Sequence, residues 1–175
     1  MDNDALAHAM APCGPVLDAG AAERVREIAA AAAQTEGWAD LLADAWPALA
    51  PAFGASHYLA GLVRSEPGRL HRLLAADPQA GLARLLGEAF EAGGQAPEDG
   101  ARRLRHAKAE LHLLTALADL GRVWDLDQVT AALSRFADAA VDAALRLAAR
   151  EGVERGRLVL RLASRPPRIS CWVWT

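Results

Sequence analysis

Hydrophobic residues recur at steps of three and four through most of the chain, which is the period of amphipathic helices. Glycine, proline and capping residues interrupt this pattern at intervals typical of helix ends. The pattern therefore predicts about seven helices, which is an all-α helical bundle. The expected helices cover residues 21–36, 38–49, 56–63, 69–76, 81–92 and 101–120, and a seventh begins after Asp125.

Several helix ends carry explicit signals. Asp77 is placed to cap a helix with Pro78 in its first turn, and Asp125 with Gln128 has the spacing of a capping box. Pro47 should weaken the end of the second helix, and Pro51 should terminate it. A short connection around Gly121, expected to follow the C-cap, predicts that the last two long helices pack antiparallel.

The apolar positions of the last three helices predict which sides face the core. On the helix over 81–92 the buried set should include Leu85 and Phe90. On the two long helices the expected inward positions are Leu104, Ala107, Leu111, Leu114 and Leu117, then Val129, Leu133, Phe136, Ala140, Ala144 and Leu147.

Both ends of the chain lack this periodicity. We interpret residues 1–19 as a loose leader, residues 20–150 as one helical domain, and residues 151–175 as an irregular tail. Gly152, Gly156, Pro166 and Pro167 should stop the last helix soon after residue 150.

The composition is typical of a helical protein and disfavours nucleic acid and anionic membranes as partners. The chain is 53% hydrophobic but only 5% aromatic, so its apolar content is mostly alanine and leucine, two strong helix formers. A net charge of −3 gives no general attraction to nucleic acid or to an anionic membrane. The uncharged stretch 45–63 contains prolines and glycines and does not suit a membrane span of about 20 residues. Two distant cysteines and an acidic N-terminus favour a cytoplasmic protein.

Few residues are arranged for chemistry. Asp125 and Asp127 form an Asp-x-Asp that could hold Mg²⁺ on a strand, but their place at a helix start favours capping. The five histidines have no metal-ligand spacing, and no serine has a base at an informative distance. We therefore predict no catalytic, cofactor-binding or metal residue in this chain.

One group of residues is a candidate contact with a partner. Arg102, Arg105, Lys108 and His112 follow a helix beside its leucine positions and could bind phosphate or an acidic surface. The alternative is a solvated face with an internal pair between His106 and Glu110.

Several runs in a fixed order resemble a known family. They are 57–60, HYLA; 69–78, RLHRLLAADP; 104–108, LRHAK; 113–120, LLTALADL; and 123–134, VWDLDQVTAALS. Together they are similar to the N-terminal helical region of the bifunctional glutamine synthetase adenylyltransferase/adenylyl-removing enzymes, over roughly residues 40–165.

The resemblance implies a large cytosolic enzyme with two nucleotidyltransferase domains. One domain transfers AMP from ATP to glutamine synthetase, and the other removes that AMP with phosphate. Mg²⁺ and a nitrogen-signalling regulatory protein are also implied, with glutamine synthetase as substrate. The helical region precedes the AMP-removing domain in that family.

The chain departs from the family where catalysis should begin. Arg161 to Arg165 resembles the middle of the family's glycine turn, but Leu160 and Pro166 replace its glycine and glutamate. No acidic residue follows Arg165, so the metal motif is missing. We hypothesise that the tail is a frame-shifted reading of the metal-site strand, and that this truncated chain is inactive alone. A free-standing helical interaction module remains the alternative.

Overall fold

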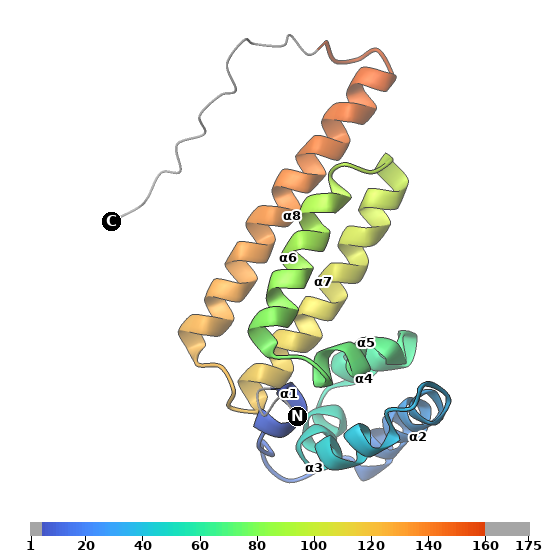
Figure 1. Cartoon of the computed structure of the whole chain (residues 1–175), viewed down its shortest axis with the longest axis vertical. Coiled ribbons are helices and arrows are strands. Elements are labelled where there is room, and N and C mark those ends of the chain that lie inside the picture. The colour runs from blue at the N-terminus through green and yellow to red at the C-terminus, as the bar shows by residue number, and fades with distance from the viewer. Residues whose placement is uncertain (1–4, 160–175) are drawn as a thin grey trace.

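The computed structural model describes residues 5–159, and within that range every regular element is an α-helix (Figure 1). The predicted all-α fold is thereby confirmed. There are eight helices among these residues: α1 Leu6–Ala9, α2 Ala19–Glu36, α3 Ala39–Ala55, α4 His57–Ser65, α5 Pro67–Leu74, α6 Pro78–Ala92, α7 Pro97–Leu120 and α8 Leu126–Glu154. No helix in this part of the chain combines the length and the apolar character that a membrane span requires.

The helices form two adjoining groups that share one hydrophobic core. Helices α6, α7 and α8 run side by side as a bundle, and α1 to α5 cluster at its lower end (Figure 1). Helix α7 runs antiparallel to α8, as the short connection at Gly121 predicted, and also to α6, so α6 and α8 run in the same direction (Figure 1). One connected set of buried side chains extends from Leu6 and Phe53 in the cluster to Leu111 and Phe136 in the bundle.

The two predicted N-terminal helix caps are present in the structure. The Asp77 carboxylate accepts a hydrogen bond from the Ala80 N–H at 2.9 Å, and Asp125 and Gln128 form a complete capping box. The turn after α7 differs from the prediction, because Gly121 has a right-handed helical backbone and Arg122 has the positive φ of 59°. Gly121 is nevertheless required, since an added Cβ would lie 2.7 Å from Met10 Cγ.

The prediction that Pro51 terminates the second helix was wrong. Helix α3 continues through Pro47 and Pro51 to Ala55. Leu49 and Phe53, at the end of this helix, are almost completely buried. Burying such side chains is worth about 1.5–3 kcal/mol each, which offsets the hydrogen bonds that proline cannot make.

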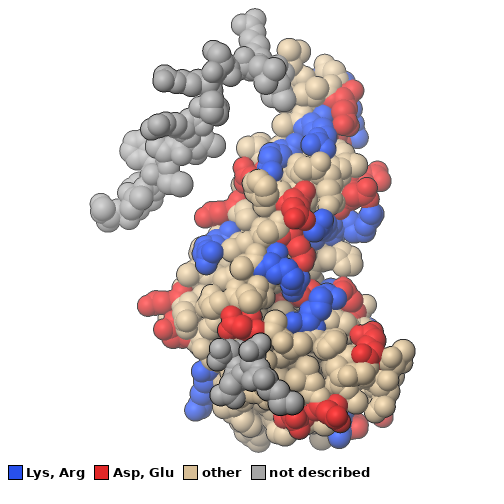
Figure 2. Space-filling view, viewed as in Figure 1, with Lys and Arg blue, Asp and Glu red and all other residues tan. Residues whose placement is uncertain are grey.

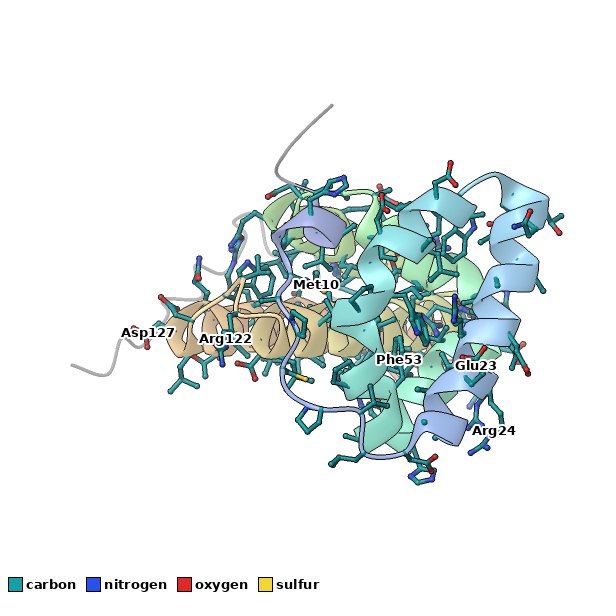
Figure 3. The ribbon with its side chains drawn as sticks, turned by 90° about the horizontal axis from the view of Figure 1, so that it is seen from below. Met10, Glu23, Arg24, Phe53, Arg122 and Asp127 are labelled. Atoms are coloured by element: carbon teal, nitrogen blue, oxygen red, sulfur yellow. The ribbon has the colours of Figure 1, made fainter. Side chains whose placement is uncertain are left out.

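Residues near the N-terminus are more closely packed than a loose leader would be. Leu6 is fully buried in α1, and its N–H donates to the Ala76 carbonyl at 2.9 Å. The Ala11 N–H donates to the Gly121 carbonyl at 3.0 Å, and Figure 3 shows Met10 on the connection that leaves α1. A helix of one turn has no periodic pattern, so the sequence did not reveal it.

The inward side of α8 is rotated from the predicted one. Leu133 and Ala144 are exposed, whereas Ala132 and Ala143 are buried with Phe136 and Leu147. The helix also continues past residue 150, through Gly152, to Glu154. The prediction failed because apolar residues occupy two faces of α8, so the pattern alone could not identify the inner one.

Phe90 on α6 was also placed wrongly in the core. Its side chain is 65% exposed, and the Arg146 guanidinium lies over its ring, 4.5 Å from the centroid. This cation–π contact accounts for an aromatic residue at the surface of the bundle.

Candidate functional site

The predicted contact residues all lie on α7, but they differ in how they are engaged. Arg102 forms an ion pair with Asp99, one turn earlier in the same helix. Arg105 and Lys108 are exposed, and neither forms an ion pair with any residue of the described range 5–159. With about 100° per residue, Arg105, Lys108 and His112 share one side of the helix, and Arg102 lies further round. We call Arg105 and Lys108 the cation pair.

His112 contributes little positive charge to this side of α7. Its Nδ1 lies 2.5 Å from the hydroxyl of Tyr58 on α4, and the two rings are 5.9 Å apart. Partial burial, reinforced by the charge of Lys108, holds the pKa of His112 below its ordinary value of 6.5. A neutral imidazole accepts a hydrogen bond from the Tyr58 hydroxyl, so the cation pair supplies the charge near neutral pH.

The predicted pair between His106 and Glu110 does not form. Glu110 is only 4% exposed, and its carboxylate instead accepts hydrogen bonds from Arg72 on α5 and Arg84 on α6. His106 lies 3.4 Å from Glu66, which precedes α5. A carboxylate buried this deeply requires cationic partners, and two arginines from other helices provide them.

Around Glu110 the charges extend into a network that joins the two parts of the fold. The Arg72 guanidinium also bonds Glu66 at 2.7 Å, and its contacts with Glu110 and Glu66 raise its pKa. Burial acts to raise the pKa of Glu66, but Arg72 and the charge of Arg69 outweigh it and lower that pKa. Arg69 is itself buried and donates to the Leu62 carbonyl at 2.5 Å. These contacts connect α4 and α5 with α6 and α7.

A shallow groove of about 430 Å³ lies beside the cation pair. It runs between the turn that joins α4 to α5 and one side of α7, and its lining includes Glu66, Arg69, Arg105 and His106. On the face that Figure 2 shows, basic and acidic side chains are interspersed along the bundle, without a broad area of one sign. The cation pair is therefore a local feature rather than part of a large positive surface.

The Asp-x-Asp carboxylates lie at the start of α8. Asp125 is occupied as the cap of α8, which confirms the capping interpretation of the Asp-x-Asp. Among residues 5–159 no three His, Cys, Asp or Glu side chains gather closely enough to ligate an ion. Residues Leu160 to Pro166, which contain the stretch that resembles the family's glycine turn, lie outside the described residues.

Comparison with known proteins gives consistent matches. The family described as glutamate-ammonia ligase adenylyltransferase matches residues 46–171. A bifunctional glutamine synthetase adenylyltransferase/adenylyl-removing enzyme of Caulobacter vibrioides is 54% identical over 155 residues, covering 87% of this chain and 15% of the relative. A relative of the same name from Rhodopseudomonas palustris is 40% identical over 169 residues, covering 87% and 16%. The chain thus spans about 15% of the length of these relatives. No solved structure matches it.

Proposed function

The chain belongs to the glutamate-ammonia ligase adenylyltransferase family, and on that premise we propose that it is a non-catalytic helical segment that binds glutamine synthetase. The names of its relatives state that they act on glutamine synthetase. In this proposal the segment contributes recognition of that protein, and the chemistry belongs to parts of the family polypeptide outside the segment.

The cation pair carries the proposal. Most arginines of the bundle are already neutralised: Arg84 pairs with Glu88 and Glu110, Arg103 with Glu91, and Arg146 with Asp142. Arg105 and Lys108 are exposed without such a partner in residues 5–159, and they lie one turn apart on the same side of α7. Arg135, which is also exposed and unpaired in this range, has no second cation one turn away on α8. Exposed cations of this kind bind carboxylates of a partner and steer its approach.

The family resemblance implies ATP and Mg²⁺ for the whole enzyme, and this proposal assigns their binding to parts of the family polypeptide outside the segment. The carboxylates near the start of α8 serve as a cap and as an exposed side chain rather than as a ligand set. We therefore derive no catalytic step from this chain. We also propose that it works in the cytoplasm and that a nitrogen-signalling regulatory protein is a second partner.

The proposal is tested by charge reversal with a matched control. Arg105→Glu with Lys108→Glu should weaken binding of the chain to glutamine synthetase at least tenfold, about 1.4 kcal/mol, because two attractive contacts become repulsive. Arg24→Glu with Arg135→Glu makes the same change in net charge at two other exposed helical positions without ion pairs in the described range. This control should bind like the wild type. Equal binding by all three proteins would refute the role of the cation pair.

A further inference from the structure

Helix α8 has a second apolar face that no described residue covers. On the side turned away from the seam with α6 and α7, Leu126 is 73% exposed, Val141 68% and Leu145 66%. Smaller apolar side chains continue this line. We call the set the outer stripe, and it consists of Leu126, Leu133, Ala137, Val141, Ala144, Leu145 and Ala148. Figure 1 shows α8 at one side of the bundle.

The outer stripe is long, and the polar residues Thr130 and Ser134 interrupt it only in its first half. At about 1.5 Å per residue it extends roughly 33 Å along the helix, and the charged residues between Asp127 and Arg146 lie to one side of it. Because Ala132, Phe136, Ala143 and Leu147 form the inner face, α8 is apolar on two sides. A helix with this distribution is normally covered on both sides, and a large exposed apolar patch marks an interface.

The acidic residues beside the outer stripe disfavour packing of this face against the outer stripe of a second copy of the chain. Asp127, Asp138 and Asp142 all lie along the same edge, by the helical period of about 100° per residue. Asp142 is paired with Arg146, but Asp127 and Asp138 have no ion pair within residues 5–159. A two-fold antiparallel contact between two outer stripes would bring these acidic edges together, with the two Asp138 side chains near the axis. Like charges in that position oppose the contact.

The greater length of the relatives points to another part of the family polypeptide as the surface that packs against the outer stripe. In the C. vibrioides relative, the counterpart of this chain is 15% of a much longer polypeptide. We propose that the outer stripe packs against another part of the family polypeptide, which presents an apolar surface with a basic edge facing Asp127 and Asp138. This inference rests on family membership and does not depend on whether the cation pair binds glutamine synthetase.

Photo-crosslinking in a whole enzyme tests the inference. In the full-length C. vibrioides relative, this chain replaces its matching segment, and benzoylphenylalanine is placed at Val141. A control protein carries the probe at Arg135, which is exposed on α8 away from the outer stripe. After irradiation, mass spectrometry identifies the peptides joined to the probe.

Cross-links from position 141 to peptides of the same polypeptide outside the segment, absent with the probe at position 135, are the expected result. Cross-links to α8 of a second copy would overturn the proposal, as would a yield at position 141 no greater than at position 135. If the hybrid enzyme does not fold, the probe goes to the aligned positions of the unmodified relative, and the same outcomes decide.

Discussion

Replacing the buried carboxylate of Glu110 tests whether the charge network holds the two parts of the fold together. Glu110→Gln keeps the size of the side chain and removes its charge. In the wild type, the carboxylate accepts hydrogen bonds from Arg72 and Arg84, which come from two other helices. The variant leaves both guanidiniums facing an amide, which can accept at only one of its two terminal atoms.

The loss of stability in Glu110→Gln depends on the ion pairs that Arg72 and Arg84 keep in the variant. Removing one partner of a fully buried ion pair costs about 3–5 kcal/mol. Here Arg72 keeps Glu66 and Arg84 keeps Glu88, and their side chains are 43% and 37% exposed, so water can solvate them. We therefore expect a loss of about 2 kcal/mol, nearer the value of one charged hydrogen bond. For a chain of this size the melting temperature should fall by about 4–8 °C.

Urea and thermal unfolding followed by far-ultraviolet circular dichroism measure this loss. Glu91→Gln is the matched control, because Glu91 also pairs with an arginine, at 2.7 Å, but is 63% exposed. That control should lose no more than about 1 kcal/mol, the usual limit for a surface pair. If Glu110→Gln is no less stable than Glu91→Gln, the network does not stabilise the fold as argued.

Three further predictions concern the cap and two titrating groups. Asp125→Ala should cost about 1 kcal/mol in urea unfolding, because the capping box of α8 is lost, and a change of only a few tenths would contradict its importance. Since the folded-state pKa of Glu66 lies below 4.5, its ionised form stabilises the protein above that pH. The wild type should therefore have a larger free energy of unfolding than Glu66→Gln at higher pH, and this difference should disappear as the pH falls through the folded-state pKa. A difference that does not change with pH would contradict this role of Glu66. By NMR, Lys108→Gln should raise the lowered pKa of His112, and an unchanged titration would exclude their interaction.

Local signals in the sequence predicted much of the secondary structure. Asp77 and Asp125 mark helix starts because each carboxylate accepts a hydrogen bond from an N–H group three residues later. Pro78 adds to the first signal because it suits the first turn of a helix. Such interactions depend only on neighbouring residues. The failure at Pro51 has the opposite origin, since burial of Leu49 and Phe53 against other helices overrides a local preference.

The candidate site was harder to predict, because its contacts join distant parts of the chain. Glu110 was expected to pair with His106 on its own helix, but it meets Arg72 and Arg84, which are 38 and 26 residues away. Tyr58 reaches His112 across 54 residues. Periodicity identified the side of α7 that carries Arg105, but only the fold shows which of its neighbours are neutralised.

A single assay tests whether this chain recognises glutamine synthetase without acting on it. Glutamine synthetase carrying radiolabelled AMP is immobilised and incubated with the chain, phosphate and Mg²⁺, and both the retained chain and the released label are measured. We expect that the chain is retained and that the label stays on glutamine synthetase. Release of the label as ADP above the protein-free control, or failure of the chain to be retained, would contradict this expectation.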